Sequence, residues 1–192
     1  MREMLLGVAD AGAFEPFWSA EIEGEWAHTA EKHERGARAF AEGEIALLNA
    51  RWPNARVRYG DGLKARLWLP DANDIHVLAA AISGSADAII TLNKKDFPSQ
   101  ILAEEGLSLL DPDAYLRGLW AAQPELVSGV ASRVLAKAQE LSGQDWDMRG
   151  LLKKARLPRL ANDFRVHVWR QYALRFLGGS RAMRAGGLRP RL

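Results

Sequence analysis

The chain has 192 residues, of which 48% are hydrophobic and 26% charged, a composition typical of one globular domain or one domain with an extension. It contains no cysteine, which excludes thiolate catalysis, disulfides and cysteine-based zinc or iron–sulfur sites, and which is typical of the reducing cytoplasm. The longest apolar runs are far shorter than the roughly 20 residues of a membrane span. No signal-peptide pattern precedes the first helical segment. We therefore expect a soluble, cytoplasmic protein.

The formal net charge of +2 conceals a division of charge along the chain. Residues 149–192 hold 12 Lys and Arg against the single acid Asp163, whereas residues 1–148 hold 14 Lys and Arg against 23 Asp and Glu. A basic arm behind an acidic body is typical of proteins with a nucleic-acid or acidic protein partner. A solvated helix face followed by a tail explains the same charges, so both interpretations stay open.

The first third of the chain is predicted to be helical. Residues 1–11 place apolar side chains at helical spacing, and Gly12 can end that helix. After an apolar bend, Ser19 can cap a second helix with Glu21 and Glu23 in its first turn. Four apolar residues at helical spacing predict a third helix, and these are Ala41, Ile45, Leu48 and Trp52.

The middle of the chain alternates strand and helix patterns. Strands are predicted at residues 55–60, 86–92 and 107–110, and a short buried helix at residues 77–82. Asp111 and Pro112 have the residue types of a helix cap and a first helical position. Such alternation predicts a parallel sheet in an α/β fold.

From Pro124 onward the pattern is helical only. One helical face carries five apolar residues, which are Leu126, Val127, Val130, Val134 and Leu135. A basic helical stretch over residues 148–177 precedes a tail rich in Gly and Arg. We therefore divide the chain into an α/β domain at residues 1–122, a helical extension at 123–177 and a flexible basic tail at 178–192.

Three polar side chains stand where function collects in parallel sheets. Asp74 lies at a helix start, while Asn93 and Asp96 follow a predicted strand. In open parallel sheets the strand ends and the neighbouring helix starts meet at one edge. Carboxylates gathered without His or Cys favour hard cations such as Mg²⁺ or Mn²⁺. A helix cap and a turn residue explain the same positions, so spacing alone does not decide.

Two of these segments resemble the closing half of a PIN-domain nuclease of the VapC-type toxin group. The family's helix motif Asp-x-His-Val-Leu-Ala-Ala reads Asp74, His76, Val77, Leu78, Ala79 and Ala80 here, and its strand-end motif reads Thr91, Asn93, Asp96, Phe97 and Pro98. Upstream, SAEIEGEW at residues 19–26 is similar to the family's Ser-x-x-Ile-x-x-Glu-Trp helix and places its acidic residue on Glu25. The likeness covers roughly residues 2–120.

This resemblance implies a three-layer α/β/α fold with a short parallel sheet and a metal-dependent endoribonuclease activity. Asp74, Asp96 and Glu25 are then the catalytic carboxylates that bind Mg²⁺ or Mn²⁺, and Asn93 with Thr91 orients ligands or phosphate. Water attack on phosphorus cuts RNA. In the toxin branch a cognate antitoxin silences the enzyme by burying the site.

The sequence departs from the family pattern at its start. PIN domains begin with a central strand that ends in an acidic residue, whereas Met1 falls where the following helix begins. We therefore expect the central strand and its acid to be absent. A misplaced start codon, a true truncation without activity, and a strand supplied by another segment or chain all stay open. Exposed apolar surface beside such a gap favours a homodimer or a partner-supplied strand.

The sequence offers little support for a zinc site and one alternative to a nuclease. His28 and His33 point about 140° apart on a helix, and no His-Glu-x-x-His motif exists, so a zinc hydrolase is disfavoured. Aromatic and basic residues interleave near Trp169 and Arg170, which is typical of either RNA stacking or amphipathic packing. The alternative function is an inactive PIN-like protein that binds a protein partner or RNA.

Overall fold

A computed structural model describes residues 1–164 of the chain. The predictions for residues 165–177, for Trp169 and its neighbours, and for the tail at 178–192 lie outside the described residues. The chain divides into two compact units, Arg2–Tyr115 and Leu116 onward with Met1. Within residues 1–164, no helix combines the length and the apolar character that crossing a bilayer requires.

The first unit opens with the three predicted helices. Helix α1 covers Arg2–Asp10 and is followed by Gly12 with a left-handed φ of +86°. Helix α2 covers Ala20–His33, and its N-cap Ser19 accepts a hydrogen bond from the backbone N–H of Ile22 at 3.3 Å, as predicted. Helix α3 covers Ala37–Arg51 and packs on α2.

Two short strands pair next to these helices. Strand β1 (Trp18–Ser19), which was not predicted, runs parallel to β2 (Arg56–Val57). Of the strand predicted at residues 55–60, only β2 is paired in the described part of the chain. The backbone N–H of Trp18 donates to the carbonyl oxygen of Ala55 at 2.9 Å. Helix α4 (Asp61–Arg66), also not predicted, follows directly.

The segment that carries the predicted site has the predicted order of elements. The 3₁₀ turn η1 (Ala72–Asp74) leads into α5 (Ile75–Ser83), and β3 (Ala88–Ile90) leads into the 3₁₀ turn η2 (Lys94–Asp96). Helix α6 (Ser99–Glu104) then connects to β4 (Ser108–Leu110), which pairs in parallel with β3. The buried helix at 77–82 and the strands at 86–92 and 107–110 are thereby confirmed.

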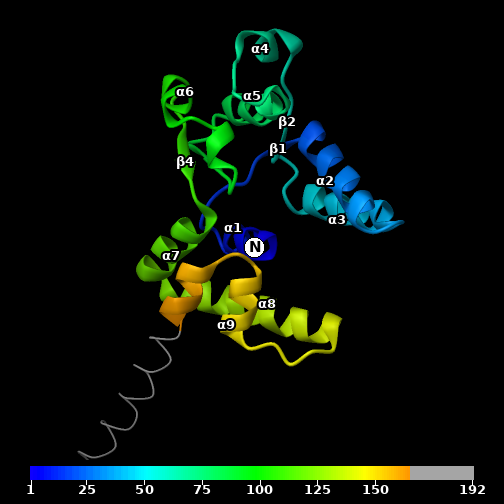
Figure 1. Cartoon of the computed structure of the whole chain (residues 1–192), viewed down its shortest axis with the longest axis vertical. Coiled ribbons are helices and arrows are strands. Elements are labelled where there is room, and N and C mark those ends of the chain that lie inside the picture. Colours follow the sequence, from blue (N-terminus) through cyan, green and yellow to red (C-terminus); the bar gives the residue numbers. More distant parts are fainter. Residues whose placement is uncertain (165–192) are drawn as a thin grey trace, which may run out of the picture. The chain divides into compact units, whose positions relative to one another are not determined.

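The strands form two separate parallel sheets rather than the single sheet that was predicted. One contains β1 and β2, the other β3 and β4, and within the described residues no strand joins the two pairs. Helix α5 packs against both β1 and β3 (Figure 1). The fold is therefore mixed α/β, mostly helical with short parallel strands. The predicted absence of a central strand stays a prediction.

The core of this unit supports the segments on either side of the predicted site. Its buried residues are Leu67, Leu69, Leu78, Ala79, Ala81, Ile89, Phe97, Leu102 and Leu107. Leu78 comes from α5 and Ile89 from β3, while Phe97 follows η2 directly. Burial of these side chains in one cluster fixes α5 relative to the end of β3.

Gly84, which ends α5, stands where a Cβ would be crowded by packed neighbours. A Cβ at this position would lie 3.2 Å from Cγ of Phe17, 3.2 Å from Cγ1 of Val57 and 3.3 Å from the carbonyl oxygen of Ala80. We expect Gly84→Ala to lower the free energy of unfolding by about 1–3 kcal/mol because packed neighbours must shift. Gly43→Ala is the control, since its Cβ meets nothing within 4 Å inside α3, and it should stabilise by about 0.5–1 kcal/mol. Thermal melts of both variants decide, and equal effects contradict this packing.

The second unit is helical. Helix α7 (Pro112–Ala122) begins in the first unit, where it was predicted to begin, with the Asp111 carboxylate accepting from the Ala114 N–H at 2.9 Å, and it continues into the second unit. Helix α8 (Pro124–Ser142) buries Val127 and Val130 of the predicted face. Helix α9 (Met148–Lys154) is capped by Asp147, whose carboxylate accepts from the Gly150 N–H at 2.7 Å. The chain is helical again over residues 158–164.

Candidate metal centre

Three aspartates lie close together, two from the turn before α5 and one from the turn after β3. Asp71 caps η1, Asp74 is the last residue of that turn and the N-cap of α5, and Asp96 ends η2 after β3. One carboxylate oxygen from each lies within 4.8 Å of those of the other two. We call Asp71, Asp74 and Asp96 the aspartate cluster. Asp74 and Asp96 were predicted as site residues, and the structure brings them together.

Asp71 is the member of the cluster that sequence reasoning missed. Its carboxylate accepts hydrogen bonds from the backbone N–H of Asn73 at 2.9 Å and from Asn73 Nδ2 at 3.0 Å. These bonds close the turn that carries Asp74 three residues later, which places both carboxylates on the same side. The i, i+3 spacing of two acids before a helix was the signal available. Neither His28 nor His33 belongs to the cluster.

The Asp74 carboxylate does not cap α5. It makes no capping hydrogen bond to the helix. Its Oδ2 instead accepts a hydrogen bond at 3.2 Å from Nδ2 of Asn93, which lies 19 positions further along the chain. Asn93 is held in turn, because its backbone N–H donates to Oγ1 of Thr91 at 3.0 Å. The structure thus places the two predicted orienting residues, Thr91 and Asn93, in a chain of contacts that ends on Asp74.

The electrostatics of the cluster are unfavourable for a lone carboxylate. Burial, followed by the charges of Asp71, Asp96 and Glu25, raises the pKa of Asp74 above its ordinary value, and nearby His76 opposes this shift weakly. The repulsion among carboxylates held together in this way favours binding of either a proton or a metal cation. Oxygen-only donors of this kind suit Mg²⁺ or Mn²⁺ better than Zn²⁺, which prefers nitrogen and sulfur ligands.

Glu25, the third predicted carboxylate, lies beside the cluster rather than inside it. Its side chain extends from α2 and is 59% exposed, and its Oε2 lies 3.3 Å from Nε2 of His76 on α5. Its charge reaches Asp74, because it contributes to the raised pKa of that residue. The structure therefore places Glu25 as an outer carboxylate, within electrostatic reach of the aspartate cluster.

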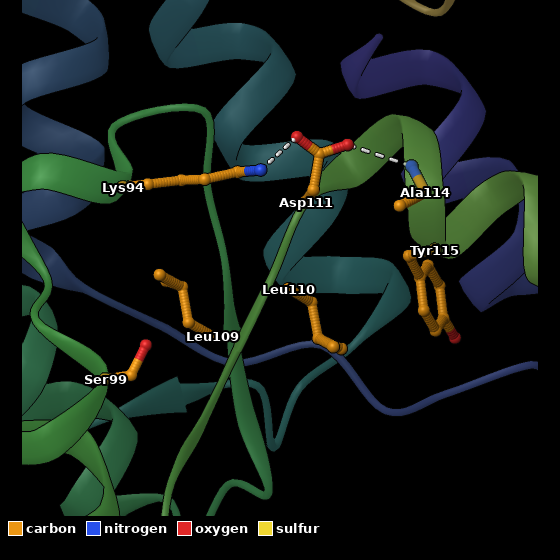
Figure 2. A pocket seen from close by; sticks show the side chains of 7 residues that line it. All are labelled: Lys94, Ser99, Leu109, Leu110, Asp111, Ala114 and Tyr115. Carbon is orange, nitrogen blue, oxygen red and sulfur yellow. Dashed lines mark hydrogen bonds and ion pairs between the residues drawn. The ribbon is translucent and has the colours of Figure 1, made fainter. Parts of the chain in front are cut away.

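A cleft of about 380 Å³ lies next to η2 (Figure 2). Its lining residues are Lys94, Ser99, Leu109, Leu110, Asp111, Ala114 and Tyr115. Lys94 Nζ pairs with Asp111 Oδ2 at 2.8 Å across it, and burial raises the pKa of Tyr115. None of the lining residues belongs to the aspartate cluster, so we locate the candidate centre by its carboxylates. The lining residue Lys94 belongs to the same turn, η2, as Asp96.

Comparison with known proteins identifies one family. A family model described as a PIN domain matches residues 2–95. The matched segment contains Glu25, Asp71, Asp74 and Asn93, and it ends one position before Asp96. No curated protein and no solved structure matches the chain.

Proposed function

The chain belongs to the PIN-domain family through residues 2–95, and from this premise we propose that it is a divalent-metal-dependent endoribonuclease that hydrolyses RNA phosphodiester bonds. The observation that carries the proposal is the meeting of Asp71, Asp74 and Asp96 in a domain of nuclease type. A helix cap and a turn residue would not need to approach each other. Their convergence supports a shared ligand.

The donor set fits Mg²⁺ or Mn²⁺. Carboxylates of the aspartate cluster would hold the ion, with Glu25 acting directly or through water. When bound, such an ion supplies Lewis acidity for the phosphodiester and makes water available as a nucleophile near neutral pH. Relief of the repulsion that raises the pKa of Asp74 favours binding of the cation.

The chain's own residues orient the site and attract the substrate. Asn93 fixes Oδ2 of Asp74, and Thr91 fixes Asn93, so that the Asp74 carboxylate is held before substrate arrives. Lys94 and Lys95 lie in the same turn as Asp96 and are exposed. Lysines beside an acidic cluster, of which Lys94 is paired with Asp111, give RNA phosphates a favourable approach to it.

The biological setting that we propose is a toxin–antitoxin pair in the cytoplasm. The motifs from Asp74 to Ala80 and from Thr91 to Pro98 support this, since they resemble those of the VapC-type group. A cognate antitoxin would silence the nuclease by covering the aspartate cluster. Phe40 and Leu47, 71% and 72% exposed, lie seven residues apart on α3 and support a homodimer or partner contact there.

The second candidate is an inactive PIN-like protein that acts by binding a partner or RNA. The division of the strands into two separate pairs favours it, because the acidic cluster then lacks any contribution from a strand between β1 and β3 in the described part of the chain. The two candidates differ in metal chemistry. An inactive protein binds its partner whether or not the carboxylates are intact.

The test combines Mn²⁺ titration by calorimetry with cleavage of a structured RNA. We expect Asp96→Asn to weaken Mn²⁺ binding by more than the roughly 10- to 100-fold that follows loss of an outer-shell partner, and to abolish cleavage. Asp87→Asn is the control, because Asp87 is exposed and precedes β3, at the opposite strand end. Cleavage that persists in Asp96→Asn, or that is unchanged when the metal is chelated, contradicts the nuclease proposal.

A further inference from the structure

Exposed cations gather on and just after helix α9, outside residues 2–95, which match the PIN domain. Arg149 and Lys153 lie on α9, Arg156 lies two residues beyond its last residue, and all three are exposed. Because Arg149 and Lys153 are four residues apart, they are neighbours on the helix surface. Arg156 follows Lys153 by three residues, which keeps their Cα atoms within about 11 Å. We call Arg149, Lys153 and Arg156 the basic surface.

The basic surface has no acidic partner within residues 1–164. Several exposed cations of the first unit are paired, as Arg38 is with Glu42 at 2.8 Å, whereas no ion pair involves a cation of the basic surface. Asp163 is the single acid of residues 149–192, and its carboxylate already accepts a hydrogen bond from Nε of Arg117. Like charges at neighbouring positions repel, so the basic surface favours an anion supplied by another molecule.

Arg149 stands at the end of α9 where a cation is least favourable. It is the second residue of the helix, and the first turn contains no acid. The positive end of the helix dipole favours an anion there and repels a cation. The N-cap carboxylate of Asp147 accepts from the backbone N–H of Gly150 at 2.7 Å and, in the described part of the chain, forms no ion pair with Arg149. Helix stability therefore does not explain an arginine at this position.

Arg156 has a backbone conformation that suits glycine. Its φ is +61°, in the left-handed region, and its N–H donates to the carbonyl oxygen of Lys153 at 3.0 Å as α9 ends. Gly12 and Gly143 follow α1 and α8 with φ of +86° and +63°, since glycine adopts this region without steric cost. The helix dipole favours a cation at this end, which explains Lys153, but a glycine at position 156 would remove the steric cost. The chain thus has an arginine where the fold favours glycine.

We propose that the basic surface binds RNA, with its three cations in contact with phosphates. Two of the three stand where the fold disfavours them, which indicates a role in binding rather than in folding. RNA fits as the anion because residues 1–148 hold 14 Lys and Arg against 23 Asp and Glu and repel it, so that a nuclease of this composition needs a cationic surface elsewhere. The inference rests on the proposed function only in this choice of RNA.

Fluorescence anisotropy of a labelled single-stranded RNA, measured in chelator over a salt series, tests the basic surface without metal or cleavage. Each phosphate contact steepens the slope of log affinity against log salt by about 0.7, which at about 0.15 M salt corresponds to about fourfold in affinity relative to 1 M. We expect Arg149→Gln and Arg156→Gly each to show this loss, and the double variant about 15-fold. Unchanged RNA affinity in both variants overturns the proposal.

Arg38→Gln is the matched control for net charge. It removes the same charge as Arg149→Gln, but from a cation that is already paired with Glu42. We expect it to leave both the RNA affinity and the salt slope as in wild type. Equal losses in Arg38→Gln and in the basic surface would mean that RNA responds to the overall charge of the chain, which contradicts a binding surface at α9.

Thermal melts of the same variants separate binding from folding. We expect Arg156→Gly to melt about 2–4 °C above wild type, because glycine removes the steric cost of the left-handed φ, and Arg149→Gln to melt no lower than wild type. A variant that is more stable and yet binds RNA more weakly has lost a contact and not its fold. Lower melting temperatures together with unchanged RNA affinity would mean that both arginines serve the helix.

Competition and cleavage decide between the remaining outcomes. If poly-glutamate displaces the labelled RNA as well as unlabelled RNA does at equal charge, the basic surface binds an acidic protein, which overturns RNA as its ligand. If the chain binds RNA through the basic surface but cleaves none in Mn²⁺, the proposed function fails and this inference stands. Cleavage with the wild-type KM in the double variant overturns this inference and leaves the proposed function intact.

Discussion

Asp74→Asn is expected to abolish RNA cleavage and, without metal, to raise the stability of the fold. Asp74 is the member of the aspartate cluster that Asn93 holds in place, and burial and three neighbouring carboxylates raise its pKa. Its ionised form therefore destabilises the folded protein when no cation is present. Asn has nearly the same shape, carries no charge and can still accept the hydrogen bond from Asn93. Removing this charge abolishes metal binding and relieves the repulsion between Asp74 and the neighbouring carboxylates.

The pH dependence of the Asp74→Asn effect has a definite sign. Because the pKa of Asp74 is higher in the folded than in the unfolded chain, the folded state binds its proton more readily. The associated stability is fully present below the unfolded pKa and is lost as the pH rises through the folded pKa. Glu21 and Glu105 have lowered pKa values, owing first to hydrogen bonds from Lys64 and Arg66, and respond in the opposite direction. Comparing variant with wild type isolates Asp74.

Thermal melts in chelator and in Mn²⁺ measure both effects of Asp74→Asn. In chelator we expect the variant to melt above wild type at pH 7, by a margin that shrinks as the pH falls toward the ordinary range of an aspartate. In Mn²⁺ at about 100 times its dissociation constant, wild type should gain about 2.7 kcal/mol and the variant should gain little. A variant that melts below wild type by the same margin at every pH contradicts this account of the cluster.

Those parts of the site that depend on local sequence could be predicted. The helix start at Asp74, the strand before Asn93 and the cap at Ser19 each rest on a pattern of a few neighbouring residues, and the structure has all three. The predicted strands were longer than the observed ones. Pairing ends where the neighbouring strand ends, and β1 and β2 share only the two pairs Trp18–Arg56 and Ser19–Val57.

Contacts between segments distant in the chain could not be predicted. The meeting of Asp71 with Asp96 is such a contact, because the two residues come from turns 25 positions apart in the chain. The contact between His76 and Glu25 depends on how α2 packs against α5. The family motif indicated both residues, but only packing shows that they touch. The pairing of Lys94 with Asp111 likewise depends on β3 and β4 lying side by side.

Leu78→Ala is expected to give the largest loss of stability among these variants. Leu78 is fully buried in the core cluster and lies one helical turn after Asp74 on α5. Truncating a buried Leu removes apolar burial and leaves a cavity, at a cost of about 2–5 kcal/mol. Ile89 of β3 and Phe97 after η2 belong to the same cluster, so the cavity opens between the two segments that carry Asp74 and Asp96.

Urea denaturation of Leu78→Ala, with Leu47→Ala as the matched control, measures this cost. Leu47 is 72% exposed on α3, so its truncation should change the free energy of unfolding by no more than about 0.5 kcal/mol. Because the core and not the carboxylates is altered, Leu78→Ala should still bind Mn²⁺ under conditions where it remains folded, unlike Asp74→Asn. Equal midpoints for Leu78→Ala and Leu47→Ala would mean that α5 does not rest on this core. The aspartate cluster would then need another explanation for its geometry, because the core cluster is what joins α5 to the end of β3.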